Sequence, residues 1–149
     1  MNINKIIIKN NNIRIQGLTL IEMLIVIAIL GILVTIAYPS YKTSLLKSHR
    51  SDALQTLSQD QIILERCYSQ NFSYNELCTA LPTFPQISIQ GFYSITLSNK
   101  ETSTYTLTAT PIGNQLQDTT CANFSVNQAG VKTSTDSSGA AQTVCWNPT

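Results

Sequence analysis

A single acidic residue stands inside the longest apolar segment of the chain. The segment covers residues 18–38, and Glu22 is its only charged side chain. A carboxylate within a bilayer costs about 3 kcal/mol or more at the centre and less toward the end of the span. This placement favours a role for Glu22 as the partner of a cation in apolar surroundings. The alternative is a tolerated carboxylate that reaches the membrane interface.

The four cysteines all lie beyond the apolar segment. An even number of cysteines in a small domain past a membrane anchor indicates an oxidising compartment and disulfide bonds. Four cysteines allow three connectivities, and the sequence alone does not choose among them. We favour local pairing because each bond then closes a short loop, which contributes roughly 3 kcal/mol in the chain-entropy model. The favoured pairs are Cys67–Cys78 and Cys121–Cys145.

The sequence contains no recognisable catalytic or metal-binding motif. There is no CxxC pair, and the one histidine, His49, is remote from the cysteines in sequence, which disfavours a zinc site. No serine or cysteine stands in a nucleophile motif, and no glycine-rich phosphate loop is present. We expect no enzymatic activity, no cofactor and no metal. His49 is expected on the polar face of a helix, and Trp146 in the core or against a disulfide.

Basic residues are few beyond the apolar segment. After the first 17 residues, six Lys/Arg face eight Asp/Glu, a balance of about −2. DNA binding needs a basic surface, yet beyond Arg66 only Lys100 and Lys132 are basic. Nucleic acid is therefore a disfavoured partner, unless these two lysines lie together with aromatic side chains.

The apolar segment is long enough to cross a membrane as a helix. Its 21 residues match the ~20 that a transmembrane helix needs. Pro39 follows, where it should kink or locally open a helix that continues. An apolar stripe at helical spacing then predicts an amphipathic helix over about 40–68. The stripe consists of Leu46, Ala53, Leu57, Leu64 and Tyr68, with Ser48, Ser51, Gln55 and Arg66 on the opposite face and Ile62 as an exposed exception.

Alternation of apolar and polar residues in the second half predicts a sheet over about 92–133. A connecting loop at about 69–91 precedes this sheet, and a disulfide-closed tail covers 121–145. The expected fold class is α+β, with a long N-terminal helix packed on an antiparallel sheet of about four strands. The strands are expected near 93–97, 104–110, 122–127 and 131–133.

The start of the apolar segment carries a specific motif. Gly17 is followed by Leu-Thr-Leu-Ile, then by Glu22 and an uninterrupted apolar stretch. This arrangement resembles the prepilin signature of type IV pilins. The resemblance implies that residues 1–17 are a leader peptide and that a prepilin peptidase cuts between Gly17 and Leu18 on the cytoplasmic side. It also implies methylation of the new amine of Leu18, which stands where the family usually has phenylalanine.

The same resemblance implies a location and partners. Residues 18–38 would be the transmembrane and assembly helix, and residues 39–149 an extracytoplasmic globular domain. The protein would reside in the inner membrane and then in the extracellular pilus of a Gram-negative-type bacterium. Its partners would be other pilins, the prepilin peptidase, the inner-membrane assembly platform and membrane lipid. A neighbouring pilin's N-terminal amine would pair with Glu22 and fix the helix register during assembly.

The C-terminal half resembles minor pilins of the PilE type. The residues that carry this likeness are 105–111, the Cys121…Gly130…Lys132-Thr133 stretch and the closing Cys145-Trp146. The resemblance implies a pilus subunit that helps to prime assembly, with motility, adhesion or DNA uptake downstream. A pseudopilin of type II secretion is an alternative, although only Asp136 stands near 134–141 as a calcium ligand. A surface adhesin or a DNA-binding subunit is the alternative of a different class.

Overall fold

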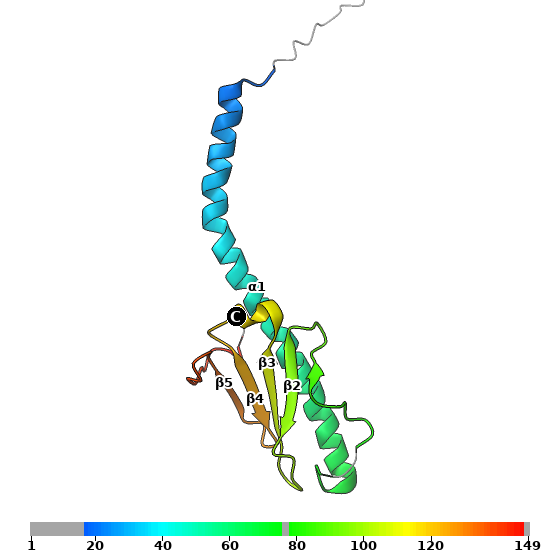
Figure 1. Ribbon diagram of the computed structural model, residues 1–149. Helices are drawn as coiled ribbons and strands as arrows, with labels where there is room; N and C mark the ends of the chain where they lie inside the picture. The colour runs from blue at the N-terminus through cyan, green and yellow to red at the C-terminus, as the bar shows by residue number, and fades with distance from the viewer. Residues whose placement is uncertain (1–16, 76–77, 148–149) are drawn as a thin grey trace, which may run out of the picture. The chain divides into compact units, whose positions relative to one another are not determined.

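The chain divides into two compact units, with the boundary between Tyr38 and Pro39. One long helix, α1 (Leu20–Asn71), continues across this boundary. The computed structural model describes residues 17–75 and 78–147. The first unit holds the apolar part of α1, and the second holds the rest of the helix and a sheet (Figure 1). The expected combination of a long N-terminal helix with an antiparallel sheet is confirmed.

Up to Tyr38, α1 is an apolar helix whose side chains touch little else. The Thr19 hydroxyl accepts a hydrogen bond from the backbone N–H of Glu22 at 3.3 Å, which satisfies one free donor of the first turn. The large apolar side chains from Leu18 to Tyr38 are 44% to 83% exposed. The helix is long and apolar enough to cross a membrane. Lipid or other helices must therefore cover this segment.

The helix continues through Pro39 instead of ending there. A proline within a helix cannot donate to the carbonyl four residues earlier. The Thr43 hydroxyl donates to the Pro39 carbonyl at 3.0 Å, one turn further on. The kink expected at Pro39 stays a prediction. The helix ends at Asn71, three residues beyond the expected Tyr68, and Phe72 follows in the left-handed conformation with φ of 51°.

The sheet has five antiparallel strands, which are neighbours in the order in which they follow along the chain. The expected sheet of about four strands therefore gains one, β1, inside the expected connecting loop. A strand of two residues is too short to show alternation, so sequence periodicity could not reveal it. The strands are β1 (Gln86–Ile87), β2 (Tyr93–Ser98), β3 (Thr106–Pro111), β4 (Asn123–Asn127) and β5 (Lys132–Thr135), and a 3-10 helix, η1 (Gly113–Gln117), follows β3.

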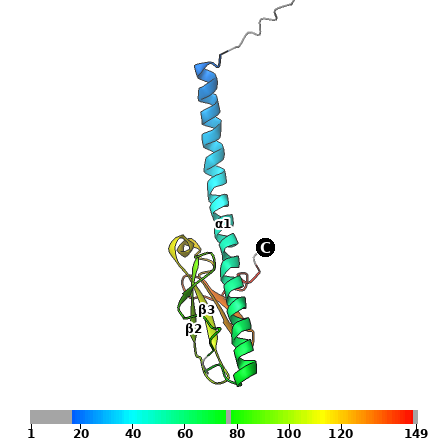
Figure 2. The same ribbon diagram turned by 90° about the vertical axis from the view of Figure 1, so that its right-hand side faces the viewer.

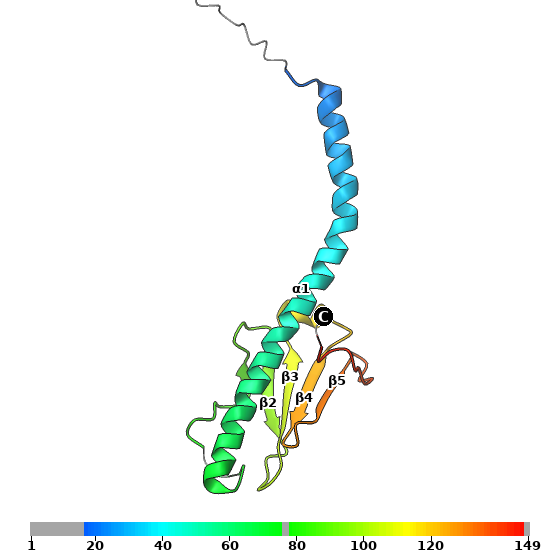
Figure 3. The same cartoon turned by 180° about the vertical axis from the view of Figure 1, so that it is seen from behind.

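One face of the sheet is apolar and the other carries hydroxyl groups. The second half of α1 lies along the apolar face (Figures 2 and 3), where Ala53, Leu57 and Leu64 of the helix are buried. Burial of each large apolar side chain contributes about 1.5–3 kcal/mol, so this layer is the core. The strands bury Tyr93, Ile95, Leu107, Ala109, Phe124 and Val126, and the opposite face carries Ser94, Thr96, Thr106, Thr108, Ser125 and Thr133.

A buried aspartate fastens α1 to the loop before β2. Asp52 is fully buried, and its carboxylate accepts the Ser88 hydroxyl and the backbone N–H groups of Gln90 and Phe92. The Ser88 hydroxyl in turn accepts the backbone N–H of Tyr93 at 2.9 Å. Each hydrogen bond to a charged group contributes about 1.5–3 kcal/mol. The loop is therefore held on the helix at the point where β2 begins.

Asp60, two turns further along α1, should make stability depend on pH. Its side chain is buried, and Gln86 Nε2 donates to the carboxylate. Desolvation raises the pKa of Asp60 from 3.8 to about 6, against the opposing effect of the Gln86 hydrogen bond. The pKa of Asp60 is thus higher in the folded than in the unfolded protein, so protonation of Asp60 favours the folded state. This contribution to the free energy of unfolding is complete below pH 3.8 and is lost as the pH rises through about 6.

We expect Asp60→Asn to flatten the pH dependence of stability between about pH 4 and pH 6. The free energy of unfolding at neutral pH should rise by about 1–2 kcal/mol, since the amide needs no ionisation in a buried position. Chemical denaturation of the full-length protein in non-ionic detergent at several pH values measures both effects. A variant that keeps the pH slope of the parent, or is less stable than the parent at neutral pH, would contradict this assignment.

Candidate functional site

The residues of the prepilin motif lie at the start of the first unit. Gly17 and Leu18 precede α1, and Leu18 is 70% exposed. Glu22 lies in the first turn of α1 with an exposed side chain. The Gly17–Leu18 bond is outside the helix and accessible, which a peptidase requires. Processing at this bond and pairing of Glu22 stay predictions.

The cysteines form two bonded pairs that tie the ends of elements to loops. Cys67, near the end of α1, is bonded to Cys78 in the connecting loop, with the Cα atoms 5.9 Å apart. Cys121, just before β4, is bonded to Cys145 in the C-terminal tail, with 5.7 Å between the Cα atoms. The structure thus has the local pairing. Among the described residues no cysteine is free, and no group of three His, Cys, Asp or Glu side chains could hold a metal ion.

Three basic residues lie at the end of the second unit where α1 ends, which we call the loop end. Arg66 is in the last turns of α1, Lys100 is in the turn between β2 and β3, and Lys132 begins β5. The β2–β3 turn, which carries Lys100, and the β4–β5 turn, which precedes Lys132, lie at the same end of the sheet (Figure 1). The backbone N–H of Tyr74 donates to the carbonyl of Thr102 at 3.0 Å, which joins the chain after α1 to the β2–β3 turn.

Aromatic side chains accompany these basic residues. The Lys132 ammonium lies 5.2 Å from the centroid of the Trp146 ring, within cation–π range. The indole N–H of Trp146 donates to the carbonyl of Thr133 at 2.9 Å, and the ring packs edge-on against Phe124. Trp146 therefore packs against the core, as expected, and also positions Lys132.

Two tyrosines hold a carboxylate at the same end. The Glu65 carboxylate accepts the hydroxyl of Tyr74 at 2.9 Å and that of Tyr105 at 3.1 Å. Desolvation, together with Glu65, raises the pKa of Tyr105 to about 12. Tyr68 stacks on Tyr74 with 4.5 Å between ring centroids. Because Glu65 and the exposed Glu101 are both acidic, the loop end is only weakly basic.

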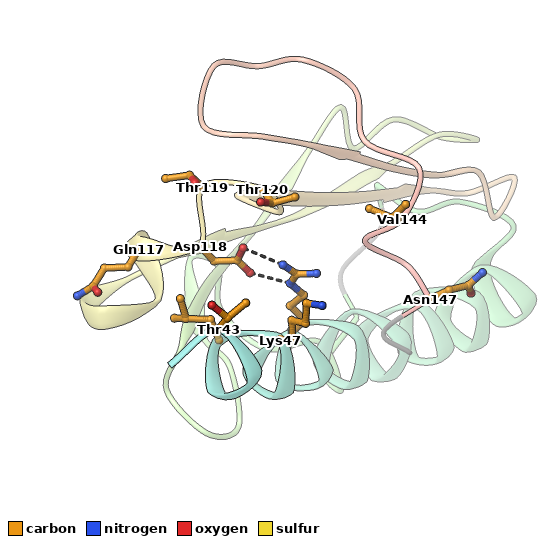
Figure 4. A pocket seen from close by; sticks show the side chains of 10 residues that line it. Thr43, Lys47, Gln117, Asp118, Thr119, Thr120, Val144 and Asn147 are labelled. Atoms are coloured by element: carbon orange, nitrogen blue, oxygen red, sulfur yellow. Dashed lines mark hydrogen bonds and ion pairs between the residues drawn. The ribbon is translucent and has the colours of Figure 1, made fainter. Parts of the chain in front are cut away.

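A buried ion pair lies at the opposite end of the second unit. Arg50 is 7% exposed, and its guanidinium donates to both carboxylate oxygens of Asp118 at 2.7 and 2.9 Å. Such bidentate pairs are among the strongest polar contacts in proteins. The pair forms one wall of a pocket of about 610 Å³. Figure 4 shows Thr43 and Lys47 on α1, Asp118, Thr119 and Thr120 on the loop after η1, and Val144 and Asn147 on the tail.

His49 lies beside this pair and is not on the open polar face where the sequence placed it. Its ring stacks on Phe92 with 3.6 Å between centroids, and Nδ1 is 3.0 Å from the Gln115 side-chain oxygen. Gln115 is fully buried and also donates to Asp118 and to the hydroxyl of Tyr93. The cause of the difference is a long-range contact, since residues 92 and 115 close over this part of the helix. His49 therefore has a structural environment.

The comparison with protein families decides the identity. Residues 39–125, more than half of the chain, match the family described as type IV minor pilin ComP, DNA uptake sequence receptor. The chain belongs to this family of type IV minor pilins. Residues 13–38 match the prokaryotic N-terminal methylation motif. The expected pilin fold and the expected role as a pilus subunit are thereby confirmed, and the apolar N-terminal helix fits a membrane-anchored subunit.

Curated proteins and solved structures that are similar to parts of this chain include other pilins. A type IV major fimbrial protein FimA from Dichelobacter nodosus is 40% identical over 52 residues, which are 35% of this chain. The chain spans about a third (33%) of the length of that relative. The minor pilin PilV of Neisseria meningitidis shares the fold, with a TM-score of 0.51 and 20% identity over 64% of this chain and 92% of the other. A type IV pilin from Shewanella oneidensis has a TM-score of 0.43 and 28% identity over 58% and 89% of the two chains.

Within this minor pilin, sequence reasoning missed the Arg50–Asp118 pair. Arg50 lies four residues after Leu46 and three before Ala53, inside the apolar stripe of the amphipathic helix. A charged residue in such a stripe has to find a partner when the stripe is buried. The position of Arg50 in the stripe therefore indicated a buried charge with an acidic partner. The identity of the partner was hidden, because Asp118 is 68 residues away in sequence.

Proposed function

We propose that this minor pilin contacts DNA at the loop end of its globular domain, from within an extracellular type IV pilus. The observation that carries the proposal is the match of residues 39–125 to a family described as a DNA uptake sequence receptor. The matched range includes Arg66 and Lys100, while Lys132 lies just beyond it. Composition alone disfavoured DNA, because only Lys100 and Lys132 are basic beyond Arg66. Composition does not show where these residues lie in the fold.

The arrangement at the loop end supports contact with the phosphate backbone. Arg66 and Lys132 are exposed and Lys100 is half-buried, so all three can reach a ligand. The three residues come from the last turns of α1, the β2–β3 turn and the start of β5, which lie at this end of the second unit (Figure 1). The ring of Trp146 beside Lys132 adds an aromatic surface, which is the second ingredient of nucleic-acid binding sites.

The position in the cell follows from the N-terminal motif. We infer that residues 1–17 are removed between Gly17 and Leu18, that residues 18–38 anchor the chain in the inner membrane, and that residues 39–149 lie on the periplasmic side. The match of residues 13–38 to the N-terminal methylation motif supports processing by a prepilin peptidase. Assembly with other pilins would then carry the globular domain to the cell surface.

DNA affinity should depend on salt as expected for about three phosphate contacts. Each contact contributes about −0.9 to the slope of log K against log salt, so the slope should be about −2.7. We expect Lys100→Gln and Lys132→Gln each to reduce the magnitude of that slope by about 1. Fluorescence anisotropy of labelled duplex DNA with the full-length protein in non-ionic detergent measures both quantities.

Two matched variants control this prediction. Lys42→Gln makes the same change of charge on α1 but far along the helix from the loop end, and it should leave the slope unchanged. Glu101→Gln removes an acid beside Lys100 and should strengthen binding. Equal effects of Lys42→Gln and Lys100→Gln would contradict a site at the loop end. In cells, the double lysine variant should lower DNA uptake with piliation intact; loss of pili would instead favour a role in priming assembly.

A further inference from the structure

The pocket beside the Arg50–Asp118 pair has a positive character that the pair does not cancel. Asp118 accepts Arg50 Nε and Nη2, the Gln115 amide and the backbone N–H of Cys121, so its two oxygens are fully engaged. Lys47, one turn before Arg50 on α1, lines the same pocket and makes no ion pair with any described residue. The net charge that the pocket offers to a ligand is therefore that of Lys47.

Arg50 also keeps donors for a ligand. Only Nε and Nη2 bond to Asp118, and Nη1 makes no hydrogen bond to the described residues. No side-chain nitrogen or oxygen in the described chain is both fully buried and without a partner. Nη1 therefore keeps some exposure, and Arg50 is one of the residues that line the pocket. A guanidinium that is fixed on one edge presents its remaining N–H groups in a defined direction at little cost in entropy.

The donors surround the pocket from several sides. Lys47 and Thr43 lie on α1, and Thr119 and Thr120 lie on the loop after η1 (Figure 4). Arg50 lines the same pocket. A carboxylate has two oxygens in one plane, whereas a phosphate directs oxygens to several sides and suits such an arrangement better. At about 610 Å³ the pocket is larger than a phosphate ion requires. The remaining space fits a phosphate attached to a larger polar group.

The position of the pocket along the chain indicates the source of that phosphate. A second hollow, lined by Ser40, Thr43, Ser44 and Lys47, shares two residues with the pocket. It begins in the first turn of α1 after the apolar segment that ends at Tyr38. Lys47 follows Tyr38 by nine residues, about two and a half turns of α1, so the pocket is close along the chain to the apolar segment. We propose that the pocket binds the phosphate group of an anionic membrane phospholipid before the chain enters the filament.

The test is titration calorimetry with the full-length protein in non-ionic detergent. The probes are a short-chain phosphatidylglycerol, the matching short-chain diacylglycerol and inorganic phosphate. We expect saturable binding of one phosphatidylglycerol and no binding of the diacylglycerol. Lys47→Gln should weaken binding roughly tenfold, since one charge-assisted hydrogen bond is lost. Lys42→Gln is the matched control, because Lys42 is on the same helix and does not line the pocket.

Each outcome bears on the proposal. Binding of phosphatidylglycerol that is weakened by Lys47→Gln and unchanged by Lys42→Gln supports it. Inorganic phosphate bound as tightly as phosphatidylglycerol would support a phosphate site and overturn the lipid as its source. Equal weakening by both lysine variants would overturn the pocket, because it would show attraction to any nearby positive charge. Absence of saturable binding to a folded protein, checked by circular dichroism, would overturn the proposal altogether.

Discussion

Replacement of Asp118 by asparagine should lower the free energy of unfolding by about 3–5 kcal/mol. Arg50 is 7% exposed and donates two hydrogen bonds to this carboxylate. Removal of one partner of a buried ion pair leaves the other charge in a site of low dielectric constant without compensation. A domain of this size has a total stability of about 5–15 kcal/mol. The variant should therefore be partly unfolded under conditions in which the parent is folded.

Chemical denaturation followed by circular dichroism measures this loss, and two further variants interpret it. Glu101→Gln removes an exposed carboxylate and should change stability by less than about 0.5 kcal/mol. The double variant Arg50→Gln/Asp118→Asn removes both charges and should be more stable than Asp118→Asn alone, because no uncompensated charge remains. A loss below about 1 kcal/mol for Asp118→Asn would show that Arg50 finds water or another acceptor.

Glu22→Gln should reduce the amount of this pilin in sheared filaments by at least about tenfold. The side chain lies in a helix segment that is uncovered in the single chain and must be covered by lipid or by other helices. In such a bundle the carboxylate can pair with a neighbouring N-terminal amine, and a pair worth only about 1.4 kcal/mol corresponds to a tenfold change in equilibrium. The glutamine side chain is similar in shape to glutamate but has no charge. The contact that fixes the register of the helices would therefore be lost.

Quantitative mass spectrometry of sheared filaments and of membranes measures this prediction. A methylated peptide that begins at Leu18 should remain in the membrane fraction of Glu22→Gln, because the proposed cleavage between Gly17 and Leu18 would precede assembly. Glu22→Asp keeps the charge and should recover part of the incorporation. Normal levels of the Glu22→Gln chain in filaments would refute pairing by Glu22. Accumulation of uncut precursor would instead assign Glu22 to processing.

The features that depend on local order along the chain could be predicted from the sequence. The apolar segment and the prepilin motif are each continuous in the sequence. The stripe of α1 and the alternation in β2 to β4 repeat within a few residues. Periodicity reports which face of an element is buried without reference to any partner. The α+β class followed from these elements, because a helix stripe and a sheet face must cover each other.

The contacts between distant parts of the chain were decided by the tertiary structure. Arg50 and Asp118 are 68 residues apart, and the strand β1 exists only because β2 offers it a ladder. Lys132 approaches Trp146 because the Cys121–Cys145 bond and the hydrogen bond from Trp146 to Thr133 hold the tail beside β5. The antiparallel strand order places the β2–β3 and β4–β5 turns at the same end of the sheet. Periodicity carries no record of which elements become neighbours. The prepilin motif and the apolar segment were therefore determined by the sequence alone. The pocket and the loop end exist only because folding brings separate segments of the chain together.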